Sequence, residues 1–579
     1  MERRVLLAIF LSFLVLYSYQ AFFTTPTPAP SALPGTTAVA PGQASAGTGT
    51  ADRAVPGGVA VESAARSTAA PVVSDSTERD IRIETPQVVA VFTNRGARLK
   101  SWRLKKYFDS RHAPLELVAV DLADTQPLPF SLRTSDAATT ADLNTSLYTV
   151  RGAPALSVVQ TTPTELTFEY QDDAGLHAVK TFRVDPVGYT VTFQTRISGS
   201  AGAINPEIVW GPGLGDSDAQ AGRYAVKAGA LYSAAGKVSR VAAKGIAAQP
   251  TYDQNFEYAG IDDHYFTTIA VKLGSGKVTY QNLSIPPPAG SKDPARDLVA
   301  YSIAPAQADQ AVTFYIGPKD FDALAFIDRN LVKAIDFGMF SVIVVPLLRS
   351  LNWIHSYVGN YGWAIFILTV LINLVLFPLN HKSVVSMRKM QEIQPETKAI
   401  QERYAKLKTT DPARQKMNSE LMALYKERGV NPASGCVPIL LTLPVFLAFY
   451  SLLTTAIELR GAPFFGWIHD LSQPDPYYVM PILVGISQIV TQWMTPQAGV
   501  DPTQQKMMMI MPVVLIFVFV STPSGALIYW LVGNVWRLGQ QYLTNYLIGP
   551  PNVRTIRPAA ERRVKRVGAG KTDGAARES

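Results

Sequence analysis

Long stretches without a charged side chain constrain this chain more than any other feature. Five uncharged apolar stretches lie at residues 5–23, 361–380, 436–455, 477–494 and 507–520, and a sixth, 526–547, contains one charge, Arg537. A helix needs about 20 apolar residues to cross a bilayer. The sequence therefore predicts a polytopic α-helical membrane protein with six spans, the fifth being short.

The first apolar stretch predicts an N-terminal transmembrane anchor at 1–23. It is longer than the apolar core of a cleaved signal peptide, and no small-residue cleavage site follows closely. Arg3 and Arg4 precede it, which favours a cytoplasmic N-terminus. Residues 24–80 are rich in Ala, Pro, Thr, Gly and Ser. Such a composition cannot bury a core and predicts a flexible linker.

Residues 81–320 show the two-residue period of β-strands. Apolar side chains alternate with polar ones at Val191, Phe193 and Ile197, and turn signals such as 173–175 and 186–188 recur between such stretches. No long helical pattern intervenes. We expect a large antiparallel β-sandwich on the periplasmic side.

The pattern changes to a helical period at Phe321, Leu324, Ile327, Leu331 and Ile335. Further on, Pro346 interrupts a short apolar segment, and an aromatic-polar mixture typical of a membrane interface follows it. We therefore interpret residues 321–358 as an amphipathic helix on the periplasmic membrane surface, not as a span.

Loop charges test the topology independently. The segment 381–435 has eleven basic and six acidic residues, and 550–579 has eight basic and three acidic residues. Basic loops remain in the cytoplasm. The predicted order after residue 358 is the second span (359–380), a cytoplasmic helical hairpin (381–435), the third span (436–457), a periplasmic loop (458–476), the fourth span (477–494), a cytoplasmic loop (495–506), the fifth span (507–522), a turn with the sixth span (523–548) and a basic cytoplasmic tail (549–579).

The cytoplasmic hairpin carries two apolar helical stripes, one from Met387 to Leu407 and one from Met417 to Leu424. Asp411 and Pro412 form a helix-start signal between them. Two interpretations remain open. The hairpin is either a solvated spacer or a mobile flap whose methionines meet incoming apolar segments.

Polar side chains within the predicted spans are candidates for a hydrophilic groove. In the last span, Trp530, Asn534, Arg537 and Gln541 recur at the spacing of one helical face. Polar contacts between helices are the alternative explanation, but an intramembrane arginine needs water or a partner. The complete set of groove candidates is Thr369, Asn373, Thr442, Gln488, Gln492, Tyr529, Trp530, Asn534 and Arg537.

Composition argues against several other classes. The single cysteine, Cys436, excludes an intrachain disulfide and a zinc-finger site. The net charge of +8 comes from basic residues beside apolar stretches, which favours membrane topology over nucleic-acid binding. We find no nucleophile triad, metal-ligand cluster or phosphate-binding loop. We therefore expect neither an enzyme nor a bound metal or cofactor.

Five short motifs in the chain resemble one known family. They are NWIHSYVGN at 352–360, GVNPASGCVP at 429–438, WIHDL at 467–471, DPYY at 475–478 and PSG at 523–525. Together they are similar to the YidC family of Gram-negative bacteria, and the resemblance covers essentially the whole chain. It implies a periplasmic β-supersandwich and five core helices around a hydrophilic groove that is open to the cytoplasm and to lipid.

The resemblance also implies function and partners. It implies a monomeric inner-membrane insertase and chaperone that acts on nascent membrane proteins in the phospholipid bilayer, alone or with the Sec translocon and its accessory subunits. The third and fifth spans are implied to form the apolar surface along which a substrate helix leaves. We assign to this surface Pro444, Phe446, Leu447, Phe449, Tyr450, Met508, Met511, Leu515 and Phe519.

One position departs from the family pattern. Relatives usually have a basic residue in the second span where this chain has Asn373. Arg537 is our candidate for the missing groove cation, since the helical rise places both residues about 10–15 Å from the cytoplasmic end of their spans. The alternative is that Arg537 extends to the cytoplasmic headgroups.

Other interpretations stay open at this stage. A secondary transporter would also have polar residues in mid-membrane, but we find no internal repeat of the kind that such proteins show. The β-domain could instead be a carbohydrate-binding module on a passive anchor, although no binding cluster stands out in residues 81–316. The basic tail could bind ribosomes or anionic lipid, or serve only as a topology signal.

Overall fold

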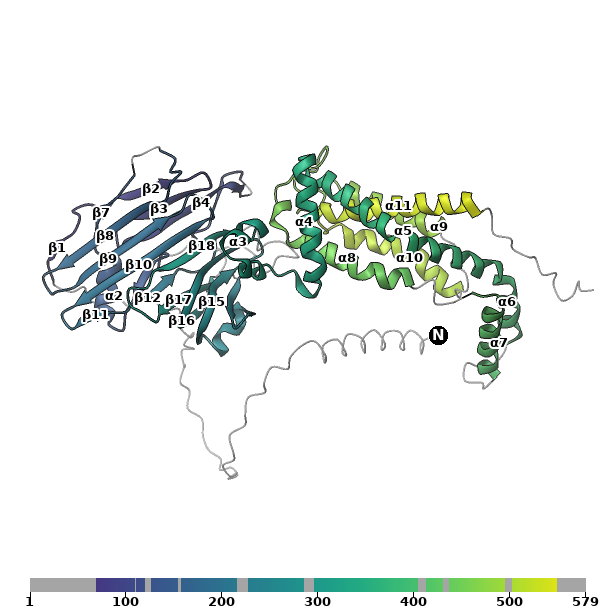
Figure 1. The fold of residues 1–579 in the computed structure, drawn as a ribbon, viewed down its shortest axis with the longest axis horizontal. Helices are drawn as coiled ribbons and strands as arrows, with labels where there is room; N and C mark the ends of the chain where they lie inside the picture. Colours follow the sequence, from purple (N-terminus) through teal and green to yellow (C-terminus); the bar gives the residue numbers. More distant parts are fainter. Residues whose placement is uncertain are drawn as a thin grey trace, which may run out of the picture. The chain divides into compact units, whose positions relative to one another are not determined.

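The computed structural model describes residues 69–548, except 110, 120–125, 155–157, 216–226, 286–295, 405–412, 431–436 and 495–501. The predicted anchor at 1–23, residues 24–68 of the predicted linker and the tail at 549–579 lie outside the described residues. Strands dominate up to residue 318, and helices follow from residue 321 (Figure 1).

Two antiparallel sheets build the β-domain. The large sheet comprises β1 (Pro71–Val73), β6 (Ser131–Arg133), β7 (Thr149–Arg151), β8 (Thr164–Asp172), β9 (His177–Val184), β10 (Thr190–Gly199), β11 (Gly202–Ile204), β12 (Glu207–Trp210), β13 (Gly229–Ala234), β14 (Lys237–Ala242), β15 (Thr251–Asp262), β16 (Phe266–Ile285), β17 (Arg296–Pro305) and β18 (Val312–Pro318). The small sheet comprises β2 (Asp80–Glu84), β3 (Val88–Thr93), β4 (Arg98–Phe108) and β5 (Pro114–Glu116). Strand β1 lies inside the segment that we assigned to the linker, so the folded domain begins earlier than predicted.

Alternating side chains of the strands form the core of this domain. Val191, Phe193 and Ile197 of β10 are buried, and the ring of Phe193 lies 4.8 Å from that of Phe182 on β9. The indole N–H of Trp102, on β4, donates to the carbonyl oxygen of Ile316 on β18 at 2.9 Å. The small sheet is therefore joined to the large one by a buried hydrogen bond as well as by apolar packing.

The segment after the β-domain is divided where the sequence predicted one helix. It forms α3 (Phe321–Ile327), the 3₁₀ helices η3 (Arg329–Ala334) and η4 (Gly338–Phe340), and α4 (Ser341–Val358). Asp328 causes the division, because its backbone is extended and its side chain accepts from the N–H of Asn330 at 2.8 Å, which starts η3. The apolar period alone does not reveal such a cap.

Helix α4 has one buried and one exposed apolar face. Val344, Leu348, Leu351 and Ile354 are buried, whereas Trp353 and its neighbours on the other side are exposed. Gly338–Val358 and Tyr361–Glu392 are the two helices in the described part that are long and apolar enough to cross a membrane. Length and composition therefore do not distinguish a span from an interfacial helix at α4.

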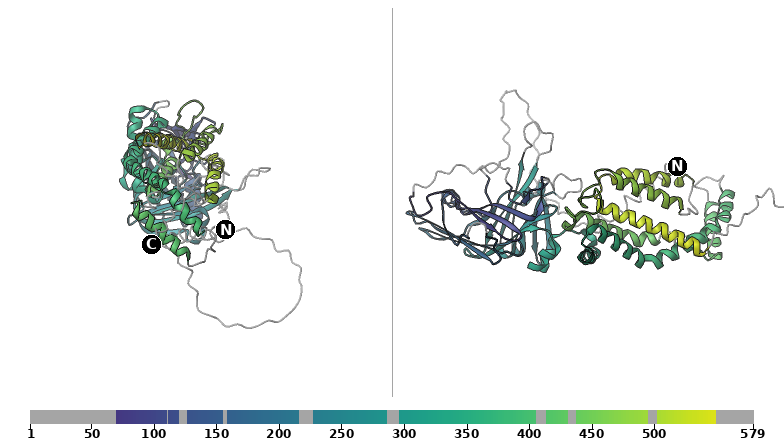
Figure 2. Two further views of the ribbon diagram at one scale, coloured as in Figure 1. Left: turned by 90° about the vertical axis from the view of Figure 1, so that its right-hand side faces the viewer. Right: turned by 90° about the horizontal axis from the view of Figure 1, so that it is seen from above.

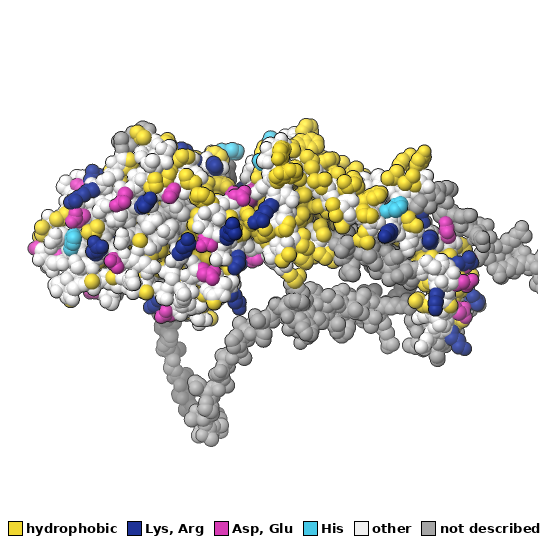
Figure 3. Space-filling view, in the orientation of Figure 1, with side chains coloured by type: hydrophobic (Ala, Val, Ile, Leu, Met, Phe, Trp, Pro, Cys, Tyr) yellow, Lys and Arg dark blue, Asp and Glu magenta, His cyan; other side chains and the backbone are white. Residues whose placement is uncertain are grey.

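Five helices form an apolar bundle. They are α5 (Tyr361–Glu392), α8 (Val437–Thr455), α9 (Val479–Met494), α10 (Pro502–Phe519) and α11 (Ser524–Ile548). Figure 2 gives two further views of these helices. Apolar side chains cover much of their visible surface, whereas charges are scattered over the β-domain (Figure 3). A surface of this kind suits hydrocarbon better than water.

Two helices follow α5 and contact each other. In α6 (Gln394–Arg403) and α7 (Ala413–Glu427), the side chain of Glu396 accepts from Arg428 just beyond α7 at 2.7 Å. The hydroxyl of Tyr404 donates to the carboxylate of Glu420 at 2.7 Å. Ile400 of α6 and Leu421 of α7 are buried as well, so polar contacts and apolar burial both hold the pair together.

A buried carboxyl group lies just beyond α8, in the 3₁₀ helix η6 (Ile457–Leu459). Burial, together with the negative charge of Asp320, raises the pKa of Glu458 to about 7. Its Oε1 atom is buried and has no hydrogen-bond partner in the described part of the chain. Deprotonating this side chain therefore creates a poorly solvated charge.

Candidate functional site

Helices α9 and α11 face each other through polar side chains. The indole N–H of Trp530 donates to Oε1 of Gln488 at 3.4 Å, and Nδ2 of Asn534 donates to the hydroxyl of Ser487 at 2.9 Å. Asn534 is fully buried, and its Oδ1 has no partner among the described residues. We call these four residues, Ser487, Gln488, Trp530 and Asn534, the polar seam. An unpaired amide oxygen inside an apolar bundle can accept a hydrogen bond from a polar group that enters it.

The predicted groove residues of α5 are bonded within their own helix. The hydroxyl of Thr369 donates to the carbonyl oxygen of Ile365 at 2.6 Å, and Nδ2 of Asn373 donates to that of Thr369 at 2.8 Å. Both bonds are of the local side-chain to backbone type. Thr369 is buried and Asn373 is half-buried, and in the described part of the chain their hydrogen bonds stay within α5.

Arg537 lies on the same face of α11 as the polar seam. At 100° per residue, it is within about 60° of both Trp530 and Asn534 around the helix. Its side chain is exposed, and in the described part of the chain it lies beyond ion-pair distance of every carboxylate. The helical period therefore aligns Arg537 with the polar seam, but its side chain is exposed, whereas that of Asn534 is buried.

One buried guanidinium was missed by sequence reasoning. Arg388, in the C-terminal part of α5, is buried and donates to Oδ1 of Asn545 at 2.7 Å. Asn545 also accepts from Nε2 of Gln541 at 3.2 Å. Arg388 escaped notice because it follows the apolar run of α5 and reads as an ordinary topology charge. Ser487 was also missed, since a lone serine in an apolar helix gives no signal of its partner.

Aromatic rings surround the polar seam. The indole of Trp530 contacts the ring of Phe446 on α8 at 4.8 Å and that of Phe519 on α10 at the same distance. The neighbouring Tyr529 stacks on Phe449 of α8 at 4.3 Å. These contacts join α8, α10 and α11, because ring pairs at such distances are attractive beyond their burial.

The residues predicted for the exit surface divide into two groups. Phe449 and Phe519 are buried by these ring contacts, so they support the bundle and offer no surface to a substrate. Leu447 and Met511 are exposed, and Pro444, Phe446, Tyr450 and Leu515 are half-buried. Exposed residues that were not predicted extend this surface, namely Leu443 on α8 and Val513, Val514, Phe517 and Val518 on α10.

Three predicted residues add little to this geometry. Gln492 follows Gln488 by one turn of α9 and is half-buried. The side chains of Thr442 and Met508 lie outside the described part of the structure, although their backbones belong to α8 and α10. Among the described residues, no group of three or more His, Cys, Asp or Glu is placed to hold a metal ion.

Two family models together match most of the chain. The model of the 60Kd inner membrane protein matches residues 353–549, and that of the YidC periplasmic domain matches residues 80–350. The first therefore covers α5 to α11 and the second covers the β-domain with most of the connecting helices.

Curated relatives extend the likeness to nearly full length. The chain is 36% identical over 555 residues to the membrane protein insertase YidC of Geobacter metallireducens, covering 94% of this chain and 98% of that protein. It is 35% identical over 565 residues to the membrane protein insertase YidC of Syntrophus aciditrophicus, covering 94% and 99%. A crystal structure of an active YidC insertase with its first transmembrane domain resolved is 20% identical, with a TM-score of 0.34, and covers 83% of this chain and 95% of that one. On the strength of the two family models and the full-length relatives, this chain belongs to the YidC family of bacterial inner-membrane proteins.

Proposed function

We propose that this chain is a membrane protein insertase that passes hydrophobic segments of nascent proteins into the bacterial inner membrane. The observation that carries the proposal is the full-length similarity to YidC insertases. The buried polar seam between α9 and α11 supports it. Neither the relatives nor the described residues point to catalysis.

The polar seam suggests how a polar tail crosses an apolar layer. A peptide group moved into hydrocarbon without a partner loses several kcal/mol, on the order of 4–8 in alkane-like solvent. The amide of Asn534 and the side chains of Ser487 and Gln488 offer hydrogen bonds within the bundle. Arg537 and Arg388 add positive charge towards the C-terminal end of α11. Together these groups form a hydrophilic groove that lowers the penalty for the tail.

The exposed apolar side chains of α8 and α10 suggest the exit. Leu443 and Leu447 on α8 and Met511, Val514 and Phe517 on α10 offer a surface that resembles hydrocarbon. A hydrophobic segment loses no solvation by moving along such a surface into lipid, whereas its polar neighbour is retained by the groove. This difference separates the two parts of a client.

The membrane topology and the partners are part of the same proposal. We place six spans in the membrane, with both termini in the cytoplasm and the β-domain in the periplasm, because the basic loops flank the spans on one side. The insertase acts as a monomer, alone or with the Sec translocon and its accessory subunits. The basic tail contacts translating ribosomes.

Depletion and complementation test the proposal. In a cell depleted of its own insertase, the segments of small membrane proteins that should be translocated are expected to remain accessible to protease on the cytoplasmic side. Expression of this chain should restore their insertion. Asn534→Leu, which removes the amide from the polar seam, should restore it poorly. Tyr546→Phe, an exposed position on the same helix, serves as the matched control. Failure of the wild-type chain to restore any client would overturn the assignment.

A further inference from the structure

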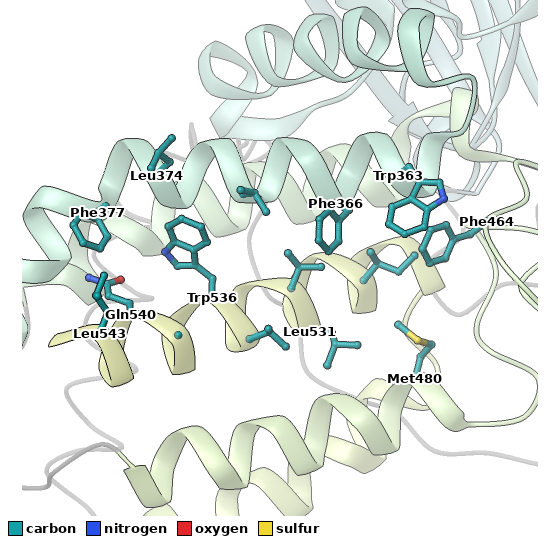
Figure 4. Close-up of a pocket in the computed structure, with 15 residues that line it drawn as sticks. Trp363, Phe366, Leu374, Phe377, Phe464, Met480, Leu531, Trp536, Gln540 and Leu543 are labelled. Atoms are coloured by element: carbon teal, nitrogen blue, oxygen red, sulfur yellow. The ribbon is translucent and has the colours of Figure 1, made fainter. Parts of the chain in front are cut away.

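A cavity of about 790 Å³ lies between α5 and α11. Its floor is formed by the buried side chains of Met480, Ile528 and Val532. Its exposed walls include Trp363 and Leu374 of α5. Figure 4 shows side chains of both helices directed into this space. The size is that of a small-molecule site.

This cavity is separate from the polar seam. Ile528, Val535 and Gly539 line the cavity, and the helical period places them on the side of α11 opposite Trp530 and Asn534. One face of α11 therefore serves the groove. The other face opens towards the hydrocarbon around the bundle.

The cavity has one polar end. Gln540 is only 7% exposed, and its Nε2 is buried with no acceptor in the described part of the chain. The indole nitrogen of Trp536, one turn earlier, is also buried and has no acceptor among the described residues. Both side chains lie near Phe377, at the end away from Trp363 (Figure 4). The last torsion of a glutamine side chain is soft, so a small rotation brings the Nε2 donor of Gln540 to the cavity surface.

A transmembrane helix fits this cavity poorly. Helices in membranes approach each other where small residues line the contact, whereas Trp363, Phe366 and Leu374 project from the wall. A helix with its side chains is also about 10–12 Å wide. A flexible acyl chain fills an irregular apolar space, and its ester carbonyl can accept the unused hydrogen bond at the polar end.

Positive charge follows the polar end of the cavity along the sequence of α5. Residues 381–391 contain Lys382, Arg388 and Lys389 and no acidic residue. Lys382 and Lys389 are exposed. Basic residues at a membrane surface attract anionic headgroups. The order of apolar cavity, hydrogen-bond donor and cations matches the order of groups in an anionic phospholipid.

We propose that this cavity binds one anionic glycerophospholipid of the cytoplasmic leaflet, with an acyl chain in the cavity and an ester carbonyl accepting from Gln540. The choice of leaflet rests on the topology proposed above. Binding itself does not, so its test is independent of insertase activity.

Native mass spectrometry of the full chain released from nanodiscs with equal phosphatidylglycerol and phosphatidylcholine tests the proposal. The wild-type chain should retain one phosphatidylglycerol. Gly539→Leu should lose it, because a side chain added there meets no atom within 4 Å and extends into the cavity. Gln540→Leu should retain it severalfold less. Gly533→Leu, also free of contacts within 4 Å but outside the cavity lining, should behave like the wild type.

Three results would overturn the proposal. They are equal retention of the two lipids, retention unchanged in a Gly539→Leu chain that unfolds at the wild-type temperature, and crosslinking from a photoreactive group at Val535 to client helices instead of lipid.

Discussion

The indole N–H of Trp530 donates to Gln488 on α9 while its ring contacts residues of α8 and α10, so this one side chain joins four of the five bundle helices. Trp530→Phe should lower the stability by about 1 kcal/mol, the value of one hydrogen bond. Trp530→Ala should lower it by about 3 kcal/mol or more, since ring packing is lost too. Thermal unfolding in detergent measures both. Trp353→Ala, at an exposed tryptophan, is the control and should change little.

Arg537→Gln should impair clients whose translocated tails are acidic and spare clients with neutral tails. This follows from the proposed role of Arg537, whose positive charge would attract carboxylates of the tail, whereas α5 carries the neutral Asn373 at the position that is usually basic in relatives. Asn373→Arg in the same chain should restore insertion, and Arg537→Lys should be mild. Protease protection of matched acidic and neutral clients measures the effect. If Arg537→Gln is silent with every acidic tail, the groove of this chain works by hydration alone.

Glu458 should make stability depend on pH. Its pKa is raised to about 7 in the folded chain by burial and Asp320, so the folded state favours the protonated form. The stabilisation of the folded state by protonated Glu458 is complete below the ordinary pKa near 4.5 and is lost as the pH rises through 7. Glu458→Gln should therefore raise the unfolding temperature at pH 8 but not at pH 4.5. Glu427→Gln, at an exposed glutamate of α7, should leave the pH profile unchanged.

Breaking helix α7 tests whether the α6–α7 pair takes part in insertion. Ala423→Pro, at an exposed position inside α7, should destabilise this helix by about 3 kcal/mol and disturb its contacts with α6. If the pair guides substrates, insertion falls while the bundle unfolds at an unchanged temperature. Ala423→Ser tests the site without breaking the helix. Full insertion by the proline variant would show that the pair is a spacer.

Truncation after Pro551 should reduce co-sedimentation with ribosomes at low salt. The removed segment carries eight basic residues, and binding of clustered cations to a polyanion weakens as salt is raised. Sucrose-gradient sedimentation over a salt series measures this. An identical salt profile for the full and truncated chains would leave the tail as a topology signal.

The sequence predicts which side chains of α11 share a face, because the helix has 3.6 residues per turn. The sequence does not predict which residues of other helices those side chains contact. That Asn534 meets Ser487, or that Phe449 packs under Tyr529, depends on how helices lie against each other, which no single helix encodes. Likewise, β1 was read as linker because three residues are too few to show an alternating pattern.

Helix α5 runs unbroken for 32 residues from Tyr361 to Glu392, a length of about 48 Å by the helical rise. It is therefore longer than the ~30 Å thickness of a hydrocarbon layer, and α6 follows it directly. Pro378 lies inside this helix and removes one backbone hydrogen bond, which is the usual cause of a kink in a long helix. The residues of α5 that line the cavity all precede Pro378, so a bend there would reorient the segment that leads to α6 and leave the cavity wall in place.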